Sequence, residues 1–163
     1  MSAKSAKVVW SRNGDLADEP LHYKGCGLDD VWLMSYERGV SDGEEYITIP
    51  DLEGLHRAIA RYLVERKKIL TGKEIRFLRI QMDLTQSELA RLFGCDAQQI
   101  ARYEKGENKM PGPADRLLRA LYKGHLDDEV PIKELLRAID EMDGRMNDKQ
   151  MFRNTKTGWR AAA

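Results

Sequence analysis

The chain has 163 residues, of which 42% are hydrophobic, and this supplies the core of one domain with a small companion. Its 27 basic and 27 acidic residues balance, so the overall charge gives no sign of nucleic-acid binding and any basic surface has to be local. The two cysteines, Cys26 and Cys95, lie far apart and outside any paired motif, which excludes a disulfide framework and a four-cysteine zinc site.

The first part of the chain predicts a small β-structure. Residues 1–20 are polar and contain Gly and Pro breakers, so we expect a flexible leader there. Segments 31–36 and 46–49 are rich in β-branched and aromatic residues, and glycines lie between them. This pattern is typical of strands and predicts a small antiparallel sheet with Trp32 and Tyr36 in its core.

A helix is expected after the sheet. Asp51 is a favourable N-cap residue, and apolar residues recur after it at helical spacing: Leu52, Leu55, Ile59 and Leu63. The pattern ends at Leu70, and the following Thr71 and Gly72 indicate a boundary. Residues 21–70 are therefore expected to form a small domain of one sheet and one helix.

Short helices are expected in the rest of the chain. Residues 71–142 predict a domain of about five helices, at 74–82, 85–93 and 96–104, after Pro111 and after Pro131. Residues 71–126 carry ten Lys or Arg against seven Asp or Glu, so this part is locally basic. Residues 143–163 are polar and basic and predict a disordered tail, with nonspecific phosphate contacts as an alternative role.

The helices expected at 85–93 and 96–104 meet each requirement for two helices that pack against each other at a steep angle. Thr85 and Glu88 form a capping box, so the first helix begins cleanly. Ala90 is small where the helices approach each other, and Gly94 permits the left-handed backbone of a tight turn. Asp96 then caps the second helix. Four apolar residues are expected to lock the pair together: Leu89, Phe93, Ile100 and Tyr103.

Once its inward positions are assigned, the second helix of the pair presents four residues outward, Ala97, Gln98, Ala101 and Arg102, with Gln99 towards the edge. Gln can bond the adenine edge bidentately and Arg the guanine edge, while alanines let a helix approach the bases. We therefore expect this helix to read double-stranded DNA in the major groove. Contacts to phosphates, which fix register rather than sequence, are expected from four further residues: Gln86, Lys105, Asn108 and Lys109.

With these residues assigned, the sequence resembles the Xre/Cro-like helix-turn-helix family over roughly residues 73–123. The spacing of that family recurs at five positions: Gln86, Ala90, Gly94, Ile100 and Tyr103. The resemblance implies a mainly α fold, in which a lambda-repressor-like bundle of about five helices follows the small antiparallel sheet and its helix. It also implies double-stranded DNA as the partner.

A narrower resemblance concerns residues 71–79 and 101–106, which look most like the C-terminal domain of MqsA-type antitoxins. The residues that match Gln98 and Arg102 are base readers in that group, although its members commonly carry Asn at the position of Gln98. The resemblance therefore implies base-reading roles for both residues.

The same resemblance bears on residues outside the reading helix. It implies a salt bridge between Arg79 and Glu104, rather than a DNA contact by Arg79. The N-terminal half of such antitoxins binds zinc through two Cys-x-x-Cys pairs, whereas Cys26 has only His22 near it in sequence. Two potential ligands do not make a site, so we expect no metal and no cofactor. Cys95 is interpreted as a small buried residue rather than a redox sensor.

These observations together predict a transcriptional repressor. A single short helix touches only a few base pairs, so we expect a homodimer on a palindromic operator. Residues 117–122 and 132–139 are the expected interface, because the helix after Pro131 lies beyond the helix-turn-helix and is free to face a partner; a contact through the sheet domain is the alternative. A repressor of this kind is also compatible with the autoregulating antitoxin of a toxin–antitoxin pair, with a toxin protein as second partner.

Three other functions are weighed against this prediction. One is a toxin-neutralising interaction protein with secondary DNA binding, and another is a ligand-sensing transcription regulator. The third, an enzyme, is rejected because the sequence shows no clustered carboxylates, no nucleophile with a base and no phosphate-binding glycine loop. The sequence also lacks a signal-peptide pattern and a bilayer-spanning apolar stretch, so we expect a cytoplasmic protein with no membrane contact.

Overall fold

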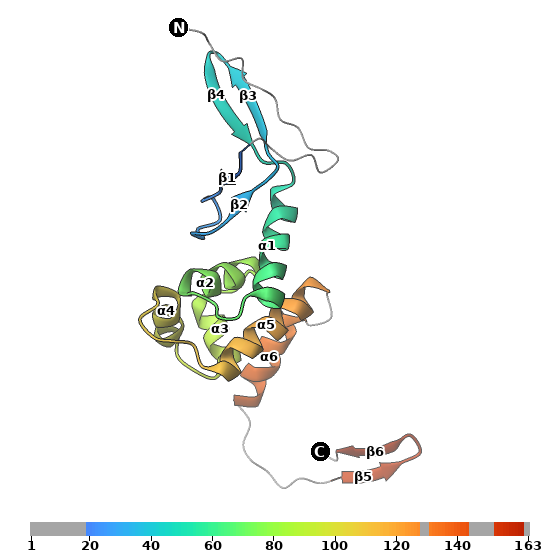
Figure 1. Ribbon diagram of the computed structural model, residues 1–163. Helices are drawn as coiled ribbons and strands as arrows, with labels where there is room; N and C mark the ends of the chain where they lie inside the picture. The colour runs from blue at the N-terminus through green and yellow to red at the C-terminus, as the bar shows by residue number, and fades with distance from the viewer. Residues whose placement is uncertain (1–18, 128–130, 144–151, 162–163) are drawn as a thin grey trace.

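The fold is mainly α, with a helical bundle preceded by small antiparallel sheets (Figure 1), as the sequence predicts. The computed structural model describes residues 19–127, 131–143 and 152–161, so the predicted leader lies almost entirely outside the described residues. The elements follow in this order: β1 (Leu21–His22), β2 (Trp32–Leu33), β3 (Glu37–Ser41), β4 (Glu44–Thr48), α1 (Leu52–Arg66), α2 (Gly72–Gln81), α3 (Gln86–Phe93), α4 (Ala97–Lys105), α5 (Gly112–Leu126), α6 (Ile132–Asp143), β5 (Phe152–Thr155) and β6 (Gly158–Ala161).

Side-chain caps fix where the helices of the bundle begin. Thr85 and Glu88 form the predicted capping box at the start of α3. A second capping box, formed by Thr71 and Glu74, starts α2. Helix α2 therefore begins at Gly72, ahead of the predicted start at Glu74, because Thr71 already satisfies the free amide of Glu74.

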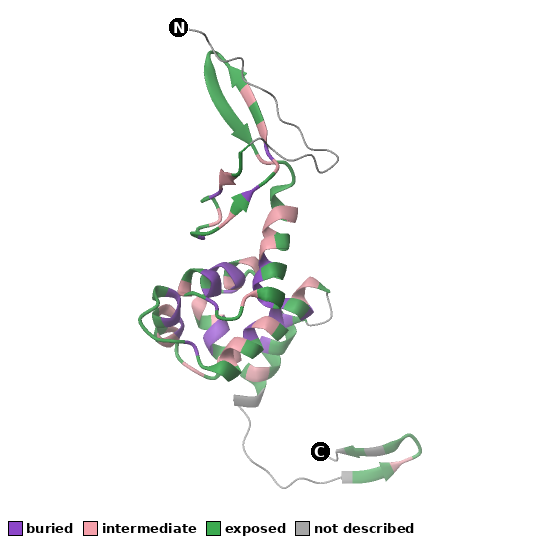
Figure 2. Cartoon of the chain, viewed as in Figure 1, coloured by how far each residue is buried: buried purple, intermediate pink, exposed green. Residues whose placement is uncertain are grey.

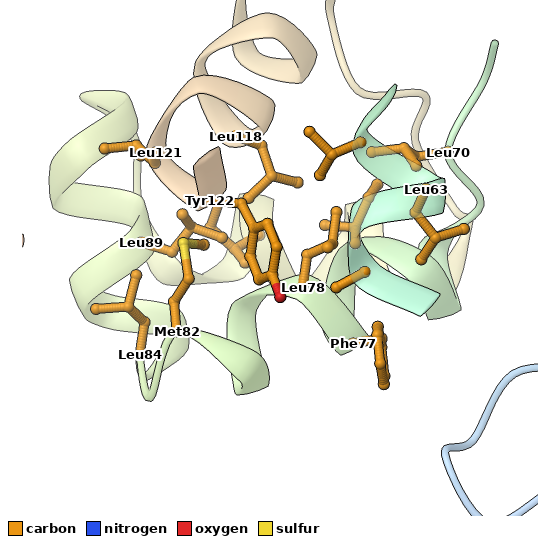
Figure 3. Close-up of a cluster of buried hydrophobic side chains, with 14 of the residues drawn as sticks. Leu63, Leu70, Phe77, Leu78, Met82, Leu84, Leu89, Leu118, Leu121 and Tyr122 are labelled. Carbon is orange, nitrogen blue, oxygen red and sulfur yellow. The ribbon is translucent and has the colours of Figure 1, made fainter. Parts of the chain in front are cut away.

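The core of the bundle gathers apolar side chains from several helices. Its largest fully buried residues are Tyr122, Leu78, Leu89, Ile100 and Leu118. Figure 3 shows the Tyr122 ring at the centre of the cluster, among leucines from α2, α3 and α5. Burial of this extent excludes water from the interior and fixes how the helices lie relative to one another.

Helix α1 shares this core. Ala60, Leu63 and Val64 are buried in the same cluster as the apolar residues of α2 and α5. Arg119 on α5 donates to the carbonyl oxygens of Leu63 and Val64, both at 2.9 Å, and so satisfies carbonyls in the last turn of α1. The boundary expected after Leu70 is therefore not a break in the packing.

The N-terminal strands form two separate two-stranded sheets rather than one. Strand β1 pairs with β2 and β3 pairs with β4, both antiparallel. The strand expected over 31–36 is restricted to Trp32–Leu33, and the one expected over 46–49 is β4 at Glu44–Thr48. Strand β3 was not predicted, because Val40 is the only β-branched residue in it. It forms a strand because it pairs with β4 along its whole length.

The two aromatic residues expected in the sheet core differ in their environments. Tyr36 is only 2% exposed and donates its hydroxyl to the carbonyl oxygen of Glu19 at 2.9 Å, so the prediction is confirmed for this residue. Trp32 is 57% exposed, and the prediction is wrong for it. A two-stranded sheet has no second layer to cover both of its faces. The indole of Trp32 stacks instead on the imidazole of His22, with ring centroids 4.4 Å apart.

Helix α6 packs onto α3. Its residues Ile132 and Leu136 are buried in the bundle core, and its Lys133 forms an ion pair with Glu88 of α3 at 2.9 Å. The helix expected after Pro131 is therefore α6, and one side of it is covered by the same chain, whereas Leu135 on it remains exposed. Its apolar residues recur at helical spacing because they cover α3 of the same chain.

A third hairpin lies in the region 143–163, where we expected disorder. Strands β5 and β6 pair antiparallel within residues 152–161. The hydroxyl of Thr155 donates to the carbonyl oxygen of Gly158 at 2.8 Å, and Gly158 has φ of 106°, a conformation that favours glycine. The turn between β5 and β6 is thus stabilised by its own residues, in a segment whose polar composition predicted a disordered tail.

Candidate nucleic-acid interface

The turn between α3 and α4 sets the angle between these two helices. Gly94 ends α3 in the left-handed conformation, with φ of 68°, as the sequence predicts. The amide of Cys95 then donates to the carbonyl oxygen of Ala90 at 3.0 Å, and the carboxylate of Asp96 accepts from the amide of Gln99 at 2.7 Å. Helix α4 therefore begins immediately after a turn whose backbone groups are already bonded.

Apolar contacts hold the inward face of α4 against α2 and α3. Ile100 and Leu89 are fully buried, Ala90 and Tyr103 are buried, and Phe93 is partly buried against the same cluster. The apolar residues predicted to lock the two helices are thus confirmed as part of the core, and α4 can present only its opposite face to a partner.

A buried ion pair connects α2 with α4. The guanidinium of Arg79 donates twice to the carboxylate of Glu104, from Nε at 2.6 Å and from a terminal nitrogen at 3.1 Å. The two side chains are 11% and 5% exposed. Arg79 also donates to the carbonyl oxygen of Leu84 at 2.7 Å, in the turn before α3. The predicted salt bridge is confirmed, and it fixes α4 at its C-terminal end.

A close backbone approach reinforces this attachment. A Cβ atom at Gly72 would lie 2.3 Å from the carbonyl oxygen of Glu104 and 2.6 Å from that of Tyr103. Only glycine lets the first turn of α2 come this near to α4. Gly72 was expected only to mark a boundary, because the residues that it approaches lie far along the chain and give no local sequence signal.

The outward face of α4 carries the five residues expected to read bases. Gln98 and Arg102 are exposed, and Ala97, Gln99 and Ala101 are partly exposed. Within the part of the chain that the structure describes, neither the Gln98 amide nor the Arg102 guanidinium forms a hydrogen bond or an ion pair. One turn of helix separates these two side chains, so they project from the same face.

The residues expected to contact phosphates fall into two groups. Lys105, Asn108 and Lys109 are exposed at the end of α4 and in the loop after it. The amides of residues 107 and 108 both donate to the carbonyl oxygen of Arg102, which holds this loop against the helix. Gln86 differs, because its side-chain Nε2 donates to the carboxylate of Glu104 at 2.8 Å inside the domain.

Ion pairs between α3 and α6 were not predicted from the sequence. The Nζ of Lys133 lies 2.9 Å from Oε1 of Glu88, and Arg91 pairs with Asp140. The backbone amide of Thr85 and then the Lys133 ammonium lower the pKa of Glu88 from 4.5 to about 2. Partners that lie more than forty residues apart give no local sequence signal.

His22, one of the two candidate metal ligands, is engaged in other contacts. His22 donates from Nε2 to the carbonyl oxygen of Asp29 and stacks on Trp32. In residues 19–127, 131–143 and 152–161 no group of three potential metal ligands comes together.

Two further expectations concern the membrane and Cys95. In the described part of the chain no helix is long and apolar enough to cross a bilayer. Cys95 packs against the core as expected, and burial raises the pKa of its thiol.

Comparison with protein families agrees with this geometry. Residues 75–121 match the family model described as helix-turn-helix, which runs from α2 into α5 and contains the complete pair α3 and α4. Over these residues the match agrees with the predicted Xre/Cro-like helix-turn-helix, and it supports a DNA-binding transcription regulator. The searches against curated proteins and solved structures both returned no match.

Proposed function

We propose that this protein is a sequence-specific repressor that places α4 in the major groove of double-stranded DNA. The observation that carries this proposal is the pair Gln98 and Arg102, exposed and without protein partners on one face of a helix. The opposite face is fixed by the buried pair of Arg79 and Glu104. A rigid helix with unpaired Gln and Arg side chains suits bidentate bonds to adenine and guanine.

The remaining residues of the interface have supporting roles in this proposal. Ala97 and Ala101 keep the helix close to the base edges and contact thymine methyl groups, and Gln99 lies at the rim of the groove. Phosphates are bound by the side-chain amide of Gln86 and by three residues at the end of α4 and in the loop after it: Lys105, Asn108 and Lys109. Gln86 can serve in this way because one amide proton bonds Glu104 and leaves the other free for a phosphate.

Replacement of the principal base reader tests the proposal. The preferred duplex is first selected from a random pool, and Arg102→Ala is then expected to weaken binding to it by on the order of 1–3 kcal/mol without changing the fold. Arg66→Ala is the matched control, because Arg66 is an exposed arginine on α1 and lies outside the helix-turn-helix match at residues 75–121. Equal affinity of Arg102→Ala and the wild type would reject α4 as the reader.

The phosphate contacts are tested by the salt dependence of binding. Lys109→Ala is expected to weaken binding to every duplex by a similar factor and to make the salt slope shallower by about one unit. Lys68→Ala, which removes an exposed lysine near the end of α1, serves as the control. An unchanged slope for Lys109→Ala would show that this side chain faces away from DNA.

A homodimer on a palindromic operator is part of the same proposal. One α4 reads only a few base pairs, and two copies related by a twofold axis supply the remaining specificity. In the two expected interface segments most of the large apolar residues are buried within the chain, but Leu117 and Leu135 remain exposed. If these leucines form the interface, light scattering will show a dimer for the wild type and a monomer for Leu117→Glu or Leu135→Glu. A monomeric wild type, even with the selected duplex bound, would reject the dimer.

An autoregulating antitoxin is the more specific form of this proposal. It is supported by the resemblance of residues 71–79 and 101–106 to MqsA-type antitoxins. The expected result is that the selected consensus occurs upstream of the gene for this chain and that the product of an adjacent gene co-purifies with it. Absence of a co-purifying partner would reject the antitoxin role and leave the proposal of a repressor unchanged.

A further inference from the structure

A cavity lies beside α1, between the connection from β1 to β2 and the start of α2, outside the proposed DNA interface. Figure 1 shows the β1–β2 hairpin next to α1 and above α2. The cavity has a volume of about 330 Å³, which is in the range of small-molecule sites. Its apolar wall is formed by four side chains: Leu28, Val31, Ile59 and Leu63.

Two large aromatic side chains also line this cavity and are largely open to solvent. Trp32 is 57% exposed and Tyr62 is 61% exposed. The Trp32 ring is nevertheless held in place, because it stacks on His22 with an angle of 11° between the ring planes. His22 is itself fixed by donating to the carbonyl oxygen of Asp29. An exposed ring that is already oriented loses little conformational freedom when a ligand binds.

The charges at the cavity favour a cation. Lys67 and Glu74 both line it, but their side chains pair with each other at 3.1 Å and so neutralise each other. Asp30 also lines the cavity, and in the described part of the chain it has no ion-pair partner. The cavity therefore combines two aromatic side chains with one uncompensated carboxylate, which is the combination that attracts organic ammonium groups.

We propose that this cavity binds an organic cation that joins a flat apolar body to a quaternary or protonated amine. The apolar body lies against Val31 and Ile59, and the cationic group lies over the rings of Trp32 and Tyr62 with Asp30 as its counter-charge. The proposal does not depend on DNA binding, because it uses no residue of the outward face of α4. It assigns to the N-terminal region a ligand site that the family match over residues 75–121 does not cover.

Binding of benzyltrimethylammonium to the full chain tests this site. Isothermal titration calorimetry is expected to show saturable 1:1 binding with Kd below about 1 mM. Benzyl alcohol, which keeps the ring without the charge, and phenylacetate, which reverses the charge, are each expected to bind at least about tenfold more weakly. Equal binding of the three compounds, or no saturable binding of the ammonium compound, would overturn the proposal.

Matched variants locate the binding to the cavity. Trp32→Ala and Tyr62→Ala are each expected to weaken ammonium binding at least about threefold, and Asp30→Asn to weaken it by a similar factor. Both aromatic side chains are exposed, so their removal leaves the core intact. Tyr46→Ala and Glu45→Gln, which change an exposed aromatic and an exposed acid on β4, are expected to bind as the wild type does. Unchanged affinity in all three cavity variants would contradict the assignment.

Discussion

The helical bundle and the β3–β4 hairpin are stabilised to very different extents. In the bundle, apolar residues are buried and the carboxylate of Glu104 is satisfied by Arg79 and Gln86, whereas both strands of the hairpin are exposed almost throughout (Figure 2). The hairpin still displays apolar side chains, since Val40, Tyr46 and Ile47 are all about half exposed. Substitutions of the same chemical type are therefore expected to change stability more in the bundle than in the hairpin.

The buried ion pair gives the largest expected effect. Glu104→Ala leaves the Arg79 guanidinium buried without its partner, and we expect it to lower the free energy of unfolding by about 3–5 kcal/mol in urea titrations. Glu45→Ala, at an exposed position in β4, is expected to change it by about 0.5 kcal/mol or less. Similar losses for the two variants would mean that the pair does not hold α4 in place.

The second expected effect compares two aliphatic residues. Leu89→Ala removes a side chain that is 0% exposed and is expected to cost about 2–5 kcal/mol of stability. Ile47→Ala, on β4, is expected to cost about 1 kcal/mol or less, because the side chain is already half in water. A loss for Ile47→Ala as large as that for Leu89→Ala would show that a partner or a second copy covers the hairpin.

A third comparison concerns two glycines whose Cβ positions are both obstructed. At Gly72 the obstacle is the backbone carbonyl of Glu104, which cannot move, and we expect Gly72→Ala to cost about 1–3 kcal/mol. At Gly39 a Cβ would lie 2.2 Å from the ring of Tyr46, but this exposed side chain can rotate away. Gly39→Ala is therefore expected to melt within a few degrees of the wild type, and a collapse of its melting temperature would refute this reasoning.

The last expected effect depends on pH. The pKa of Glu88 is lowered to about 2 in the folded chain, so its ionised form contributes stability above the unfolded value of about 4.5. This contribution is lost as pH falls from about 4.5 to about 2. Melting temperatures of Glu88→Gln and the wild type should therefore converge over that window, whereas Glu45→Gln should follow the wild type throughout. A constant gap between Glu88→Gln and the wild type would exclude a titrating Glu88.

Elements with local signals were predictable from the sequence. The capping box of Thr85 and Glu88, the turn at Gly94 and the cap at Asp96 each involve neighbouring residues, and the helices begin where these signals lie. The outward residues of α4 could also be predicted, because they are the ones that remain once the apolar positions are assigned to the core. The pairing of Arg79 with Glu104 came from the family resemblance, and the structure confirms it.

Features that depend on distant partners were not predictable. Trp32 has the composition of a core residue, but its burial depends on whether a second layer covers the strand, and none does in the described chain. The apolar residues of α6 were expected to face a partner, but Ile132 and Leu136 are buried within the chain, because a sequence pattern does not say which surface an apolar residue covers. The close approach of Gly72 to α4 was not predictable either, because the residues that it approaches lie about thirty positions further along the chain.

The attachment of α1 to α5 has a practical consequence for transplanting the DNA-binding module. A fragment cut at the limits of the family match, residues 75–121, would lose Leu63 and Val64 and would leave the guanidinium of Arg119 without two of its acceptors. The autonomous folding unit is therefore larger than the family segment. A chimera that places α4 on another protein should carry the chain from Asp51 onward, so that α1 begins at its own cap.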